Sequence, residues 1–469
     1  MIITVFRKEW LQSLRLGRVR WLLGIALLLA FASGLHTFSA YLNYQNEHAL
    51  ASQISRGDWL SQEAKNPHSA AHYGLFVFKP WSPGSLFDPG LLPFTGTTAF
   101  VEAHVKNDAV HAPISDRTTL ARWGSLSPAF ILLYLVPLLM IAIHFDTVSG
   151  ERASQMLKWT ATTGLPFGKW LAGKWLAIIV LPAFFLILCL GGSWLAAGFT
   201  WDHPQLLFGL LLGFLLFYAV LANLILWVSA FTKTPSSSLL VLLAVWILMG
   251  WAVPKVAANM AEIQHPAPSL AELRQRIDAA KRDGLMGDAI SSERLTELAG
   301  QILKELGIED TPDAAVNRDA LNMQAGEAYG YEIFDHFYQE VESNHEQQRQ
   351  LCLTSSALSP LLPAAMLSMA FSQTDAHAHW HFNRAVELYR REFVEILNRE
   401  MMLHSQTGDW GYHSHPSTWS KIPEFHYQSQ PPTQTWQRAK GYLFSLSLWG
   451  LLTSVLTFWI VPARWGWRG

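Results

Sequence analysis

Six apolar segments limit what this chain can fold into more than any other feature of its sequence. A helix needs about 20 mostly apolar residues to cross a bilayer, where its backbone polar groups must bond within the segment. Half of the 469 residues are hydrophobic and 15% are charged, which is less charge than soluble domains carry. We therefore expect an all-α integral membrane protein with six transmembrane helices. The expected spans are residues 21–42, 126–145, 170–199, 206–231, 238–256 and 441–461.

Lysine and arginine in the short flanking segments predict the orientation of these spans. The first 20 residues are strongly basic, and basic residues recur after the second span, after the fourth span and in the tail 462–469. The loop 200–204, on the opposite side, has none. Because positive charge marks the cytoplasmic side, we expect a multi-pass protein with both termini in the cytoplasm.

Residues 1–20 carry the pattern of an amphipathic helix ahead of the first span. Phe6, Trp10 and Leu14 recur at four-residue spacing and share one face, while Arg7 and Lys8 take other positions. This pattern predicts a helix that lies in the plane of the inner leaflet. The alternative is that the basic residues act only as an orientation signal. The residues assigned to this in-plane helix are Phe6, Arg7, Lys8, Glu9 and Trp10.

A polar stretch at about 147–165 separates the second and third spans, within the transmembrane unit 125–256. The pair Glu151-Arg152 opens a predicted short helix, and the Gly-Leu-Pro sequence at 164–166 closes it. A glutamate near the start of a helix is favoured by the helix dipole, and Arg152 can pair with a docked acidic partner. The alternative is that both are solvated loop charges.

Two regions, 43–124 and 257–440, are expected outside the membrane. The first is rich in Pro, Gly and aromatic residues, and its run 73–78 predicts a strand. The second has a helical pattern, with starts expected at Ser269, at 311–313 and at about Asp375. Within it, the apolar segment 356–372 is too short for a span, which favours a helix at the interface or packed on protein. A seventh span would also place the basic C-terminus outside.

Together these elements resemble a permease of the type-2, exporter-like class of ABC transporters. The resemblance rests on Arg7-Lys8-Glu9 in the in-plane helix, on the six spans, and on the Glu151-Arg152 loop with Lys174 after it. It extends to a subgroup of uncharacterised permeases with two external regions, similar to the gliding-motility and copper-maturation permeases. The apolar segment near 358–382 also matches that subgroup.

The resemblance implies a non-catalytic subunit that couples ATP hydrolysis on a separate ATP-binding subunit to export or movement of a substrate across the membrane. The chain itself has no Gly-x-x-x-x-Gly-Lys-Ser/Thr motif, so we expect ATP and Mg on that partner and no cofactor on this chain. A second permease, identical or a sister, would complete a dimer among the membrane lipids. The residues that the resemblance assigns to ATPase coupling are Glu151, Arg152, Gln155, Met156 and Leu157.

The sequence disfavours several other functions and leaves one alternative open. A net charge of −2 argues against a nucleic-acid partner. His377, His379 and His381 would fan apart on a helix, which argues against a metal site there. A mechanotransmitter that acts on a periplasmic partner without transport stays an alternative. A membrane enzyme or a metal-handling protein is less favoured.

Overall fold

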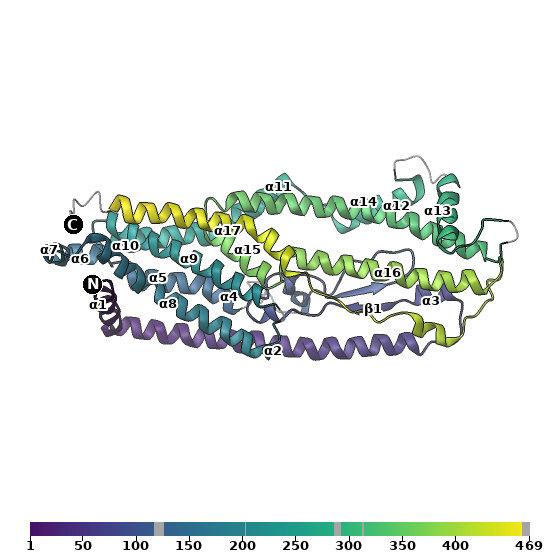
Figure 1. The fold of residues 1–469 in the computed structure, drawn as a ribbon, viewed down its shortest axis with the longest axis horizontal. Helices are drawn as coiled ribbons and strands as arrows, with labels where there is room; N and C mark the ends of the chain where they lie inside the picture. Colours follow the sequence, from purple (N-terminus) through teal and green to yellow (C-terminus); the bar gives the residue numbers. More distant parts are fainter. Residues whose placement is uncertain (117–125, 202, 286–291, 312–313, 462–469) are drawn as a thin grey trace.

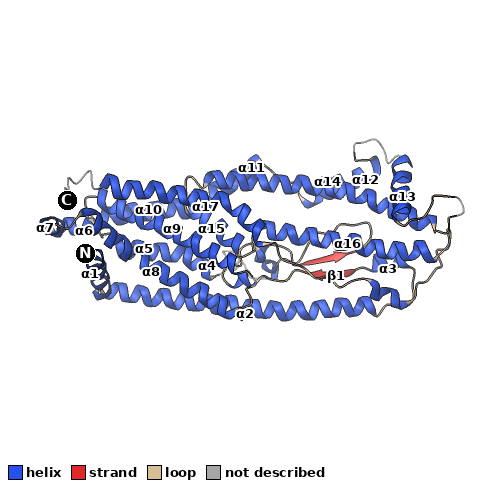
Figure 2. Cartoon of the chain, viewed as in Figure 1, coloured by secondary structure: helices blue, strands red, loops and turns tan. Residues whose placement is uncertain are grey.

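The computed structural model describes residues 1–116, 126–201, 203–285, 292–311 and 314–461. The molecule is elongated, with its long helices running roughly along its length (Figure 1). Helices account for nearly all of the regular structure, and the one sheet in the described part has two strands (Figure 2). The expected all-α fold is confirmed.

Six helices in the described residues are long and apolar enough to cross a membrane, and each contains most of one expected span. They gather in the left half of the view, where α1 (Ile2–Arg15) lies across their direction, and one of them, α2, continues into the other half (Figure 1). Their ranges are Gly17–Leu60 (α2), Pro128–Ala153, Phe167–Ala196 (α8), Pro204–Phe231 (α9), Pro235–Gln264 and Pro432–Ile460. The second comprises α4 (Pro128–Phe130), η5 (Ile131–Leu135), α5 (Val136–His144) and α6 (Ser149–Ala153). The fifth comprises α10 (Pro235–Ile247), η6 (Leu248–Ala252) and α11 (Val253–Gln264), and the sixth comprises α17 (Pro432–Val455) and η8 (Leu456–Ile460).

The first span does not stop where the sequence suggests. Helix α2 continues through residues 43–60, which were expected to open a turn-rich external region. At 1.5 Å per residue its 44 residues reach roughly 66 Å, about twice the hydrocarbon thickness of a bilayer. Residues 43–60 contain no proline, and Tyr44 in this stretch stacks on Trp81 at 4.3 Å between ring centroids. Tertiary packing therefore extends the helix beyond the length that a bilayer requires.

The rest of the first external region consists of short elements and turns over its described residues, 61–116, as expected. Helix α3 (Pro67–Tyr73) leads into β1 (Leu75–Phe78), which pairs antiparallel with β2 (Thr98–Val101). The expected strand 73–78 is thus present from Leu75. Gly74 separates it from α3 with a φ of 62°, a conformation that glycine adopts without strain. Three 3-10 turns complete the region: η1 (Pro83–Leu86), η2 (Leu92–Phe94) and η3 (Pro113–Asp116).

The second external region is helical. Ser269 caps α12 by accepting a hydrogen bond from the Glu272 amide, and Asp375 caps α16, so both expected starts are confirmed. The start expected at 311–313 includes residues 312–313, which lie outside the described part. The long helix α14 begins after Asn317, whose side chain caps it. The elements are α12 (Leu270–Asp283), α13 (Ser292–Glu305), α14 (Arg318–Ser355), α16 (Ala376–His404) and η7 (Pro416–Lys421).

Helix α15 (Leu361–Phe371) forms the apolar segment that was expected near 356–372. It packs against α9 and α17. A Cβ on Gly209 of α9 would lie 2.5 Å from the Phe371 ring, so the glycine permits this close approach. With 11 residues it is too short to span a bilayer. Of the two placements expected, the structure shows the one packed on protein.

Candidate functional site

Helix α1 docks on α8 through a face that the four-residue pattern did not identify. Val5 and Glu9 are its buried residues, while Phe6 and Trp10 are half-buried and stack on each other at 6.3 Å between centroids. At Gly173 of α8, an added Cβ would lie 2.6 Å from the Val5 Cβ. The helices therefore meet at a glycine. Arg7 is exposed.

Beneath this contact lie four charged residues, Lys8, Glu9, Glu151 and Lys174, here called the four-charge cluster. Lys174 Nζ lies 2.7 Å from Glu9 Oε1, 2.9 Å from Glu151 Oε1 and 2.8 Å from the Thr147 carbonyl oxygen. Lys8 Nζ lies 2.8 Å from Glu9 Oε1 and also pairs with Glu151. Three elements, α1, α6 and α8, thus meet in one balanced set of two acids and two bases.

The cluster is mostly shielded from solvent. The Lys174 side chain is 0% exposed and the two carboxylates are 11% exposed. Burial alone would raise the pKa of Glu9, but the ammonium groups of Lys174 and Lys8 outweigh it and lower that pKa to about 2. Burial would lower the pKa of Lys8, yet Glu9 and Glu151 leave it raised. Both groups are therefore charged at neutral pH.

The lowered pKa of Glu9 predicts a pH-dependent contribution to stability. An unfolded glutamate titrates near about 4.3, so the contribution is complete above that pH and is lost as pH falls toward about 2. We expect the thermal midpoint of the wild type to exceed that of Glu9→Gln by a constant margin from about pH 7 to pH 5. The margin should shrink below about pH 4.3. Glu293→Gln, at an exposed position, is the control, and a margin unchanged to the lowest pH would contradict the prediction.

Arg152 is engaged within the chain. Its guanidinium donates to the Thr232 carbonyl oxygen at 2.6 Å and to that of Ala230, at the C-terminal end of α9. A cation there satisfies carbonyls that the helix leaves unpaired. Ser229 Oγ, nearby on α9, accepts hydrogen bonds from the amides of Val148 and Ser149 at 3.1 Å each. The segment that begins α6 is therefore fastened to α9.

The predicted short helix at 147–165 is two helices, α6 and α7 (Met156–Thr162). Gln155 separates them in the left-handed conformation, with a φ of 61°. Leu157 is buried at 5% exposure, whereas Met156 is 48% exposed and Trp159 is 70% exposed. We call Met156 and Trp159 the α7 surface. Met156 and Trp159 are thus the large apolar side chains of α7 that are exposed.

The sequence predicted some residues of the four-charge cluster and of the α7 surface and missed others. It identified Glu9 and Glu151 but treated Lys174 as a flanking charge and did not assign Trp159. One signal was available for Lys174: it lies within the apolar sequence of the third span, and a charge in such a place needs a partner. Nothing in the sequence pattern separates the exposed Trp159 from the buried Leu157.

Comparison with known families accounts for most of the chain. The model of a domain of unknown function, DUF3526, matches residues 271–428, which is most of the second external region. No curated protein matches the chain. The model described as ABC-2 family transporter protein matches residues 106–273, which include the second to fifth spans and the segment with Glu151. Residues 106–273 are therefore similar to the ABC-2 family of transporter proteins, and this match supports an ABC-2 type permease.

Proposed function

We propose that this chain is the permease subunit of an ATP-driven transporter in a bacterial inner membrane, with both termini in the cytoplasm. A separate ATP-binding subunit, carrying ATP and Mg, would dock on the α7 surface, and a second permease would complete a dimer. The observation that carries the proposal is the position of this exposed apolar surface directly after the four-charge cluster. The family match supports a transport permease.

The contacts describe how a push on α7 would spread. Leu157 packs into the hydrophobic core that the candidate membrane helices form, and six residues earlier Glu151 pairs with Lys174 of α8 and Lys8 of α1. Arg152 joins the same segment to the end of α9. Because ion pairs and backbone bonds in a packed site resist separation, displacement of α7 would move α1, α8 and α9 together. Glu151 and Arg152 then act as the transmission, and the α7 surface is the contact.

This proposal predicts the effect of removing the α7 surface. Met156→Ala with Trp159→Ala should weaken retention of the ATP-binding subunit about tenfold or more, because exposed aromatic anchors dominate interfaces. The measurement is the ratio of the two subunits after affinity purification, together with ATP turnover in proteoliposomes. The double variant should insert and melt like the wild type, since both side chains are exposed.

Trp21→Ala is the matched control, since Trp21 is 77% exposed on α2, at the start of the first span. It should leave the subunit ratio unchanged. Equal retention of the ATP-binding subunit by the wild type and the α7 double variant would overturn the docking assignment.

One observation favours a second candidate, in which ATP hydrolysis does mechanical work on an external partner. Helix α2 runs unbroken from Gly17 to Leu60 (Figure 1). It joins the half of the molecule that holds the six candidate spans, here the membrane half, to the half formed by the two expected external regions, here the external half. A single helix across both halves can carry motion outward without a substrate path. ATP-dependent substrate flux into sealed vesicles would favour transport, whereas ATP-dependent movement of the external half without flux would favour this candidate.

A further inference from the structure

Three histidines converge on the external half of the molecule, away from the proposed docking site. They are His68 and His72 on α3 and His104, which follows β2. One ring nitrogen from each lies within 4.8 Å of the other two. The Nε2 atoms of His68 and His72 are 3.2 Å apart. Two nitrogens bound at about 2.0–2.1 Å to one tetrahedral zinc ion lie about 3.3 Å apart, so this pair already has the spacing of two ligands.

The local sequence explains the arrangement. Pro67 starts α3, and the Asn66 side chain caps it by accepting from the His68 amide at 2.9 Å. His68 and His72 are four residues apart, which places them on one face of the helix. The third histidine is brought alongside by a backbone bond from the Ala103 amide to the Ala71 carbonyl oxygen, at 3.1 Å.

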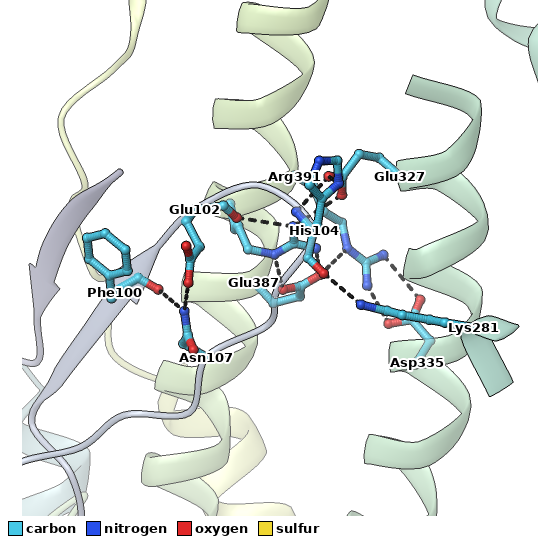
Figure 3. A network of polar contacts seen from close by, with 10 residues as sticks. Phe100, Glu102, His104, Asn107, Lys281, Glu327, Asp335, Glu387 and Arg391 are labelled. Carbon is cyan, nitrogen blue, oxygen red and sulfur yellow. Dashed lines mark hydrogen bonds and ion pairs between the residues drawn. The ribbon is translucent and has the colours of Figure 1, made fainter. Parts of the chain in front are cut away.

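His104 is held in place by three contacts with two residues, Glu327 and Lys281 (Figure 3). Its amide and its Nδ1 each lie 2.7 Å from Glu327 Oε1, and its carbonyl oxygen accepts from Lys281 Nζ at 2.7 Å. These bonds hold a residue whose φ is 63°, which is uncommon for a side-chain-bearing residue. Because Glu327 engages Nδ1, Nε2 is the ring nitrogen of His104 that remains available to bind a metal ion. A carboxylate on the far nitrogen is the usual support of a metal-bound histidine.

Glu327 is itself a fixed support. Its side chain is 1% exposed, and Arg390, 2% exposed, lies 3.4 Å from its Oε2. Figure 3 shows the wider network around His104, with Glu387, Arg391 and Asp335 on α16 and α14.

We propose that His68, His72 and His104 bind one Zn²⁺ ion, with the fourth position open to water or to an external ligand. Imidazole is a good ligand for zinc and for several other first-row metals. Three protein ligands with an open fourth position are the typical arrangement of zinc sites that bind a further ligand. His72 and His104 are exposed, so the ion would enter from solvent. The bound metal would join the first external region to α14 through Glu327. The site is independent of the proposed ATP coupling.

The test is a zinc titration of the full chain in detergent, purified without a polyhistidine tag and stripped of metal, against a chromophoric zinc chelator. We expect one high-affinity equivalent per chain. His72→Ala and His104→Ala should each weaken binding at least about 100-fold, because each removes one of three ligands. Glu327→Gln should weaken it about 10–100-fold through loss of the support to His104. Co²⁺ in place of Zn²⁺ should give the visible spectrum of a tetrahedral site.

His413→Ala is the matched control, since His413 is exposed beside Ser414, which pairs with Lys65 near the start of α3. It should bind zinc like the wild type. Should His104→Ala fail to fold, the exposed His72 decides the matter. Zinc affinity that is equal in His72→Ala and His413→Ala, or absent in the wild type, would overturn the proposal.

Discussion

Lys174→Ala should destabilise the protein by about 3 kcal/mol or more, because it leaves two largely buried carboxylates short of their buried cation. Lys174 is the fully buried member of the four-charge cluster and contacts both Glu9 and Glu151. Lys8, 43% exposed on its side chain, is the remaining cation and is partly screened by water. The measurement is the thermal midpoint of the purified protein in detergent, together with the amount recovered from membranes. Both should fall.

Two variants separate charge from other effects. Lys169→Ala removes an exposed lysine from the same helix and should change stability by no more than about 0.5 kcal/mol. Lys174→Met combined with Glu9→Gln and Glu151→Gln removes the buried charges together and should recover most of the lost stability, as replacement of a whole buried ion set often does. If Lys174→Ala were as stable as Lys169→Ala, the cluster would not be what holds α1 on α8.

The fold was predictable where one physical constraint dominates. A bilayer requires about 20 apolar residues per helix, and all six expected spans are found among the described residues. Local capping was also readable, since Ser269 and Asp375 bond to amides only three residues away. The continuation of α2 to Leu60 was not readable, because it depends on packing against segments such as that of Trp81, far along the chain.

The site was predictable only in part for the same reason. Glu9 and Lys174 are 165 residues apart, and no spacing rule relates them. The histidine trio joins an i, i+4 pair that is visible in the sequence to a residue from another segment. The alternating histidines of α16 do not form such a group. Each of His377, His379 and His381 contacts a different residue. His377 lies 3.7 Å from Glu346, His379 lies 3.2 Å from Asn383, and His381 lies 3.1 Å from the Tyr427 hydroxyl.

Helix α2, which joins the membrane half to the external half, has a buried tryptophan in its last turn. Trp59, in the last turn of α2, is 0% exposed and donates from Nε1 to the Trp419 carbonyl oxygen at 2.9 Å. Its ring meets Phe393 of α16 edge-on at 5.0 Å between centroids. In return Trp419 donates from its own Nε1 to the Gln62 carbonyl oxygen at 3.1 Å. The end of α2 is therefore fastened to the external half by apolar contact and by reciprocal hydrogen bonds.

Trp59→Ala should cost about 3–5 kcal/mol, the range for emptying a large aromatic position in a core. Because the loss is at the end of α2, we expect faster hydrogen exchange and proteolysis in α16 and η7, while the four-charge cluster and its helices keep their protection. Leu60→Ala, at a 43% exposed neighbour, is the control and should stay within about 0.5 kcal/mol of the wild type.

If α2 carries motion outward, Trp59→Ala should leave ATP turnover near wild type and abolish ATP-dependent movement of the external half. Wild-type protection of α16 in this variant would show that α2 does not fasten the two halves together.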